Sequence, residues 1–338
     1  ERVVVPRLGL LASRLIALAE GEADTTQAGR THGQHAVPIT FGFAVAEYVS
    51  RIGGRILLLQ ATARALPGKL SGAVGAYNAP ALLAKDPRAL ERRYLAHLGL
   101  KPASHSTQIV EPEAWSDLAH ACVTALGVMA NLADDMRHLQ RTEIAEIAEG
   151  FRAQQVGSST MPQKRNPVSF ENVKSMWKAF MPRIITTYLD QISEHQRDLT
   201  NSASQRFSGE LIAATAYAAT RLGASIDGVR IDRDRMKANV GLSKGGIVAE
   251  ALYVLFAKHG HPDAHEAVRR LTLEAERSGR SPLELAALDP DLRPLLAKLT
   301  PAERKVLDQP EDYRGLAPEV ARDVAKTWRA KLAGVLPE

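Results

Sequence analysis

A continuous helical pattern from residue 115 to residue 149 constrains this chain more than any other feature of its sequence. The segment WSDLAHACVTALGVMANLADDMRHLQRTEIAEIAE places apolar residues at helical spacing, and Ser116 is a suitable N-cap. A helix of this length is about three times the globular mean of about 11 to 12 residues. Such helices usually occur in bundles, so the segment predicts a protein built from long packed helices.

Further helical patterns flank this segment. They cover residues 1–20, 41–66, 82–98, 168 to about 194, and 205–227. Within the second of these, Gly53 and Gly54 indicate a point of close helix packing. After about residue 241 the helices become shorter, with breaks at HGHPDAH, SGRSP, LDPDLRP and DQPEDYRG. No strand-like alternation of any length is found, so we predict an all-α fold with two domains: a central long-helix bundle at residues 1–243 and a smaller helical domain at 244–338.

The amino-acid composition is typical of a helical protein, and together with the sequence it argues against nucleic acid and membranes as binding partners. Aromatic residues make up only 5% of the chain, whereas β-sandwich strands favour aromatic and β-branched side chains. The net charge of +5 would suit nucleic acid or a polyanionic small substrate. No run of five Lys or Arg residues and no basic stripe with interleaved aromatics is present, so no nucleic-acid partner is expected. No apolar run reaches the roughly 18 to 20 residues that cross a membrane, so no membrane partner is expected.

The single cysteine and the first residue bear on cellular context. Cys122 lies in an apolar helical run and is expected to be a small buried hydrophobe in a reducing, cytoplasmic protein. The chain opens on Glu1, inside an amphipathic pattern and without an initiator methionine. We therefore expect that an N-terminal part of the natural protein is absent.

Four polar islands interrupt the long helices, at residues 29–40, 104–111, 157–167 and 194–206. Each island interrupts the hydrogen bonds of a helix, and this free-energy cost can be offset if the islands converge on a ligand. The alternative is that they are four unrelated surface loops. No metal-ligand pattern such as HExxH or CxxC is present, and no glycine loop of the P-loop or dinucleotide type. No metal and no cofactor are therefore expected.

The remaining chemistry is acid–base chemistry. His32 has an ordinary pKa of about 6.5, near neutrality. Ser158 becomes a base only where its surroundings stabilise the alkoxide, which Lys164, Arg165 and the N–H groups of a glycine-containing loop could do. Lys164 and Asn166 could also hold negative charge that develops on a carboxylate.

Two segments resemble one enzyme superfamily. GSSTMPQKRNP resembles the signature loop GSSxMPxKxNP of the fumarase/aspartase superfamily, and GRTHGQHAVPITFG resembles its histidine region. KLSGAVGAYNAP, STQIV, MRHLQRTEIAEI and QRDLTNSASQR further resemble the adenylosuccinate lyases, in the same order, over about residues 25 to 210. The resemblance implies a long-helix bundle that assembles as a homotetramer, with active sites shared between subunits. It implies β-elimination of fumarate from adenylosuccinate to give AMP, and from the succinyl-carboxamide ribotide of purine biosynthesis.

The resemblance also assigns the proton-transfer residues. Ser158 is the base and His32 the acid. Lys164 and Asn166 hold the substrate carboxylate, and Glu171 orients His32.

A second set of residues is implied to bind the substrate. These are Thr31, Gln34, Gln108, Arg197, Ser202 and Arg206. The two arginines suit the phosphate of the nucleotide, because a phosphate is bound by paired cations. Lys69 and Ser71 fit either the site or a structural loop, and His35 and Ser159 are expected to be structural.

Three alternatives stay open at this point. Gln163, before the lysine, is common in argininosuccinate lyases, and EHQR resembles an EHxR stretch of carboxymuconate-type cycloisomerases. A non-catalytic helical scaffold is the third alternative, since some superfamily members have structural roles.

Overall fold

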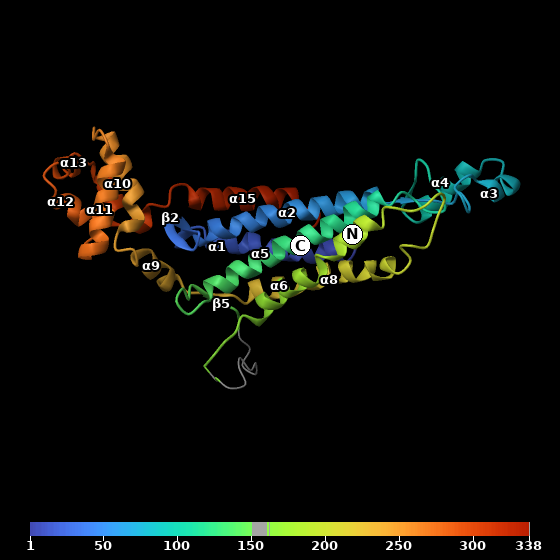
Figure 1. Cartoon of the computed structure of the whole chain (residues 1–338), viewed down its shortest axis with the longest axis horizontal. Coiled ribbons are helices and arrows are strands. Elements are labelled where there is room, and N and C mark those ends of the chain that lie inside the picture. Colours follow the sequence, from blue (N-terminus) through green and yellow to red (C-terminus); the bar gives the residue numbers. More distant parts are fainter. Residues whose placement is uncertain (151–160, 162, 338) are drawn as a thin grey trace.

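The computed structural model describes residues 1–150, 161 and 163–337, and its frame is a bundle of long helices (Figure 1). The bundle helices are α1 (Val4–Gly21), α2 (Phe41–Ala65), α5 (Glu113–Leu139), α6 (Val168–Phe180), α8 (Ser208–Asp227) and α15 (Ala317–Lys331). α1 packs against α2, α8 and α15, while α5 packs against α2, α6 and α8. Fully buried side chains such as Leu11, Ile52 and Met129 form the shared core, and each contributes about 1.5 to 3 kcal/mol by leaving water. The predicted all-α fold is confirmed.

The start of α2 matches the sequence prediction, but α5 is shorter than predicted. The Thr40 hydroxyl accepts a hydrogen bond from the Phe43 N–H at 3.1 Å and caps α2. α5 ends at Leu139 instead of continuing to residue 149, and further along the backbone turns away at Ala145, whose φ of 53° lies outside the right-handed helical region. After this turn, β5 (Ile147–Ala148) pairs with β6 (Arg230–Ile231) in an antiparallel ladder.

The helix predicted from Pro167 to about residue 194 is broken. It consists of α6 and the shorter α7 (Arg183–Leu189), which are separated at Met181 and Pro182. Proline lacks the N–H that a continuing helix requires, so α7 starts afresh directly after Pro182.

A β-hairpin occupies the first polar island, so the prediction of no strands is wrong there. β1 (Thr26–Thr31) pairs antiparallel with β2 (Gln34–Thr40). The connecting residues, His32 and Gly33, both have positive φ, 54° and 74°, as a type I′ hairpin turn requires. Thr40 then leads directly into α2, so the hairpin projects from the bundle end where α1 finishes and α2 begins.

The opposite end of the bundle carries loops and short elements (Figure 1). β3 (Pro67–Gly68) pairs in parallel with β4 (Lys101–Pro102), and α3 (Asn78–Leu83) and α4 (Pro87–His97) lie between them in sequence. The single-turn helix η1 (Ser204–Phe207) leads into α8. This end therefore collects the second and fourth polar islands.

Short helices after α8 form a second buried cluster. They are α9 (Arg233–Gly241), η2 (Gly246–Val248), α10 (Ala249–Lys258), α11 (Ala264–Ser278), α12 (Pro282–Leu288), α13 (Arg293–Leu296), α14 (Pro301–Asp308) and η3 (Pro310–Asp312). Their core includes Phe256 and Leu307, and Ala28 of β1 joins it. α15 instead returns to the bundle, where Ala321 and Ala325 are fully buried. The domain boundary at residue 243 stays a prediction, and this packing assigns α15 to the bundle core.

Within the described ranges, no single helix is long and apolar enough to cross a membrane. One bent pair, α9 with the segment Gly246–Lys258, meets the length and hydropathy requirements across a bend of 77°.

Candidate active site

The hairpin end of the bundle, meaning the β1–β2 hairpin with residues 140–149 and 163–171, holds the predicted proton-transfer residues that the structure describes. Thr31, His32 and Gln34 are exposed at the tip of the hairpin. Lys164 is exposed and Asn166 is half-buried, just before α6 begins. The Gln140 side chain, directly after α5, donates to the carbonyl of Arg165 at 3.1 Å and ties this segment to the bundle.

The other predicted catalytic residues of this end are Ser158 and Glu171. Ser158 and Ser159 lie outside the described residues. Glu171 is exposed in the first turn of α6, where its N–H donates to the Pro167 carbonyl. Among the described residues, no hydrogen bond or ion pair joins Glu171 to His32 of the same chain, so its predicted orienting role stays a prediction.

The loop end of the bundle, meaning residues 67–77, 104–111 and 190–206, holds Gln108, Arg197, Ser202 and Arg206. The Gln108 N–H donates to the Gln196 carbonyl at 3.2 Å, which joins the second and fourth islands. Ser202 and Arg206 are exposed. The Nη1 atom of Arg197 is buried and has no hydrogen-bond partner among the described residues.

Lys69 and Ser71 hold the loops of this end together. The Lys69 ammonium donates to three carbonyls, those of Gly72 at 2.7 Å, Thr107 at 2.7 Å and Gln108 at 2.9 Å. These three bonds use all its donors, and burial lowers the pKa of Lys69. Ser71 and Ser106 share a hydrogen bond between their hydroxyls at 2.7 Å. This geometry favours the structural interpretation of both residues.

Helix α5 separates the two ends. It has 27 residues, which is about 40 Å at about 1.5 Å per residue. Gln108 lies shortly before its first residue, and Gln140, which binds the Arg165 carbonyl, lies directly after its last. One chain therefore brings together the residues within each end, but it holds the two groups apart.

A buried carboxylate beneath the hairpin escaped the sequence analysis. The Glu146 side chain is fully buried and accepts hydrogen bonds from Gln27 at 2.7 Å, from Arg30 at 2.5 and 3.1 Å, and from Asn239 at 2.8 Å. A charge at this depth is tolerated because it is paired and fully hydrogen-bonded. The sequence IAEIAE carried a signal only in retrospect, because Glu146 fitted equally well on an exposed helix face.

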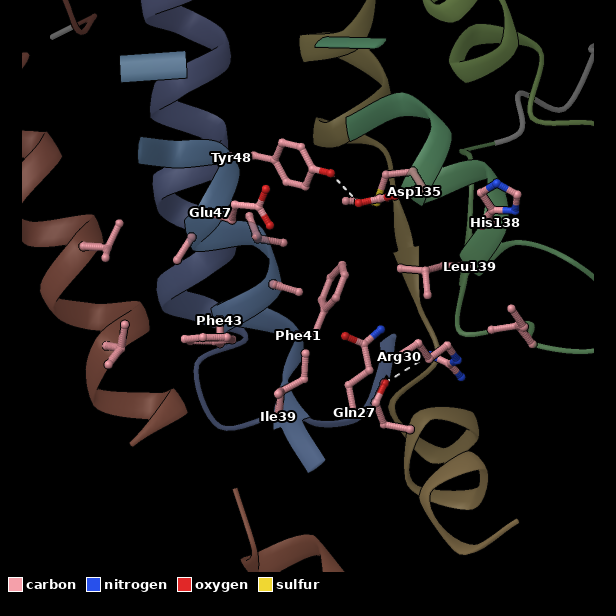
Figure 2. Close-up of a pocket in the computed structure, with 18 of the residues that line it drawn as sticks. Gln27, Arg30, Ile39, Phe41, Phe43, Glu47, Tyr48, Asp135, His138 and Leu139 are labelled. Carbon is pink, nitrogen blue, oxygen red and sulfur yellow. Dashed lines mark hydrogen bonds between the residues drawn. The ribbon is translucent and has the colours of Figure 1, made fainter. Parts of the chain in front are cut away.

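A cavity of about 840 Å³ opens beside the hairpin (Figure 2). Its apolar wall includes Ile39, Phe41, Leu139 and Val324. Tyr48 donates a hydrogen bond to Asp135 at its edge, and burial raises the pKa of both groups. None of the predicted site residues in the described part of the chain lines this cavity, although Gly33 of the hairpin turn does.

The described residues contain no group of three or more His, Cys, Asp or Glu side chains arranged to hold a metal ion.

Comparison with known proteins identifies the family. The model of the family described as Lyase matches residues 1–180, and that described as Adenylosuccinate lyase C-terminal matches residues 193–303. The chain is 36% identical to an adenylosuccinate lyase of Pyrococcus horikoshii over 93% of this chain and 69% of that protein. It is 35% identical to an adenylosuccinate lyase of Pyrococcus abyssi over 95% of this chain and 71% of that protein.

The fold is also that of solved lyase-like structures. The 3-carboxy-cis,cis-muconate lactonizing enzyme of Pseudomonas putida superposes with a TM-score of 0.83 at 24% identity, over 97% of this chain and 72% of that one. At this identity the likeness concerns the fold alone. The family models and the relatives above show that this chain belongs to the adenylosuccinate lyase family of the fumarase/aspartase superfamily.

Proposed function

We propose that this protein is an adenylosuccinate lyase, which splits adenylosuccinate into AMP and fumarate and acts likewise on the succinyl-carboxamide ribotide. The proposal rests on one observation: the sequence similarity to adenylosuccinate lyases includes the residues of both ends of the bundle. It extends over 93% of the chain, and the C-terminal family model begins at residue 193, shortly before Arg197 and Arg206. A phosphate-bearing substrate fits this pair of cations.

The reaction is an elimination in which one proton is removed from a carbon atom and one proton is added to the departing nitrogen. A base removes a proton from the carbon next to a carboxylate of the succinyl group, and the electron pair spreads into that carboxylate. The pair then forms the new C=C bond as the C–N bond breaks, and an acid protonates the departing nitrogen. We assign the base to Ser158 and the acid to His32, with Lys164 and Asn166 stabilising the charged carboxylate.

Nucleotide binding belongs, in this proposal, to the loop end, while Thr31 and Gln34 line the site beside His32. Gln108 contacts the succinyl portion, while Arg197, Ser202 and Arg206 bind the nucleotide. Support comes from the buried and unpartnered Nη1 of Arg197 within the described residues, since an anion would satisfy that donor.

A complete site needs more than one copy of the chain. The two groups of residues lie at opposite ends of α5, and a substrate of nucleotide size is shorter than its span of about 40 Å. We therefore propose that the enzyme is a cytoplasmic homotetramer in which each active site takes residues from three subunits, with hairpin-end and loop-end residues supplied by different copies.

The test is fumarate release followed by proton NMR. The full-length gene product is incubated with adenylosuccinate, argininosuccinate and 3-carboxymuconate in parallel tubes. Fumarate and AMP from the first tube alone are expected. A folded tetramer that releases no fumarate from adenylosuccinate would disprove the proposal, and turnover in another tube would replace it with the corresponding activity.

A further inference from the structure

The tip of the hairpin that carries His32 is weakly supported, whereas its base is buried and Ala28 joins the second core. An isolated two-stranded hairpin is marginally stable in water, and this one places Thr31, His32 and Gln34 in solvent at its tip. His32 also adopts a φ of 54°, a left-handed conformation that costs a residue with a side chain about 1 to 2 kcal/mol. The position of the tip therefore depends on contacts made further down the hairpin.

An irregularity in the ladder separates the tip from the base. Ala28 pairs with Pro38 and Arg30 pairs with His35, so Gly29 alone opposes Ala36 and Val37. Such a bulge re-aims the side chains that follow it. A Cβ at Gly29 would overlap the Val37 carbonyl, at 2.5 Å, so the close approach of the two strands here requires glycine.

Arg30 directly follows the bulge, and its side chain contacts a residue outside the hairpin. It forms a two-pronged ion pair with Glu146, with Nη2 to Oε1 at 2.5 Å and Nη1 to Oε2 at 3.1 Å. Among the described residues, Arg30 is the residue nearest to His32 in sequence whose side chain hydrogen-bonds to another element. Paired guanidinium and carboxylate groups fix orientation as well as distance.

Glu146 is itself held from several sides. Asn239 of α9 donates to Oε1 at 2.8 Å and to the Ile144 carbonyl at 2.9 Å. The Glu146 N–H donates to the Leu139 carbonyl at the end of α5, and its carbonyl accepts from the Asp232 N–H. Gln27, lower on β1, donates to Oε2 at 2.7 Å. Glu146 therefore links the end of α5, α9 and β1 through its backbone and carboxylate hydrogen bonds.

We propose that Glu146 is a positioning residue for the elimination reaction, which acts through Arg30 to set the place of the hairpin tip and of His32. The inference rests on the proposed function, because it takes His32 as the acid. Small displacements of a catalytic group reduce turnover steeply, by about 100-fold for 1 Å. Thr31 and Gln34 lie at the same hairpin tip and move with His32, whereas the residues proposed to bind the nucleotide lie at the other end of the bundle and do not depend on this ion pair.

The test is Glu146→Gln, which keeps the size and the acceptor oxygen but removes the charge. We expect kcat to fall about 10- to 100-fold, with a smaller change in KM because only Thr31 and Gln34 of the substrate-binding residues lie on the hairpin. Glu303→Gln is the control, because Glu303 also accepts several hydrogen bonds, from Lys258, His259 and Thr300, but lies in the second cluster away from the hairpin. That variant should keep the kcat of the unaltered enzyme.

A double-variant cycle asks whether Glu146 acts through Arg30. Arg30→Gln and the double variant Arg30→Gln with Glu146→Gln should both lose kcat by about the same factor as Glu146→Gln, because one shared interaction is lost in all three. Losses that multiply in the double variant would overturn the action through Arg30.

The outcomes separate this inference from the proposed function. If the unaltered enzyme releases no fumarate, the proposed function fails. If it does, and folded Glu146→Gln of unchanged assembly keeps its kcat within about twofold, the positioning role is disproved. Should Glu146→Gln fail to fold, the double variant, which buries no unpaired charge, carries the test: normal kcat in that variant overturns the proposal.

Discussion

The indole ring of Trp328 lies directly against the backbone of Gly53, in the space where a side chain at residue 53 would begin. This contact seats α15 on α2. The neighbouring Gly54 faces open space instead, since apart from the adjoining backbone of α2 no atom of the described residues lies within 4 Å of the position that a Cβ would take there.

Gly53→Ala should therefore destabilise the protein and Gly54→Ala should not. Overpacking at residue 53 is expected to cost about 1 to 3 kcal/mol, whereas alanine at residue 54 should be neutral or stabilise by about 0.4 to 1 kcal/mol. Urea unfolding followed by circular dichroism at one fixed protein concentration measures both. Equal stability of the two variants would contradict the role of the ring contact.

Ser158→Ala should abolish turnover and leave the fold intact. Loss of a general base typically costs about 100- to 10,000-fold in rate. Fumarate release gives the rate, and circular dichroism with size-exclusion chromatography gives the fold and assembly. Ser175→Ala, an exposed serine on α6, is the matched control. A near-normal rate for Ser158→Ala would remove this serine from the mechanism.

Arg206→Ala should weaken substrate binding more than it slows the chemical step. A hydrogen bond to a charged group contributes about 1.5 to 3 kcal/mol, so KM is expected to rise about 10- to 100-fold. AMP as a competitive inhibitor should lose affinity in parallel, because it carries the same phosphate. Arg277→Ala on α11 alters an exposed arginine outside the site and should change neither quantity. Unchanged KM in Arg206→Ala would argue against phosphate recognition there.

His35 should make stability fall as the pH falls below about 6.5. Burial, with the adjacent Arg30 charge, lowers the pKa of this imidazole in the folded protein. The unfolded chain, with a pKa near 6.5, then binds the proton first, so acid favours unfolding until the folded-state pKa is passed. His35→Gln should flatten the difference between urea midpoints at pH 7.5 and pH 5.5, whereas exposed His97→Gln should preserve it. An undiminished pH dependence in His35→Gln would assign the effect to other groups.

Cys122 should resist alkylation in the folded protein. Burial raises the pKa of its thiol to about 11, and only the thiolate reacts readily. Iodoacetamide at pH 8 should leave native protein unmodified by mass spectrometry and modify one site after unfolding in urea. Rapid labelling of native protein would show that the thiol is accessible.

The sequence predicted the parts of the fold that depend on local periodicity. Helices α1 and α2 were predicted because apolar residues recur in them at helical spacing. The pattern of α1 ends at Gly21, and that of α2 begins after Thr40 and ends before Pro67. The Gly53 contact was also anticipated. These features are set by residues close together in the chain, so a single sequence contains them.

Features set by distant partners escaped prediction. The hairpin was missed because its turn uses His32 before Gly33 instead of asparagine, and because the bulge opposite Gly29 interrupts the alternation of a strand. α5 was extended too far because Glu146 fits a helical pattern until Arg30, 116 residues earlier in the sequence, is seen to pair with it. The resemblance already implied active sites shared between subunits, whereas the end of the bundle to which each predicted residue belongs followed only from the path of α5.

The return of α15 to the bundle has a consequence for synthesis of the protein on the ribosome. α1 and α2 are synthesised well before α15, which packs against both of them and buries Ala321 and Ala325. Until α15 emerges, about 250 residues after the end of α2, the side of α1 and α2 that it covers has no native partner from its own chain, although α5 and α8 pack against other sides of these helices earlier. Contacts of such high sequence separation slow folding and leave nascent intermediates open to aggregation. A nascent chain of this protein is therefore expected to need chaperone protection for most of its translation.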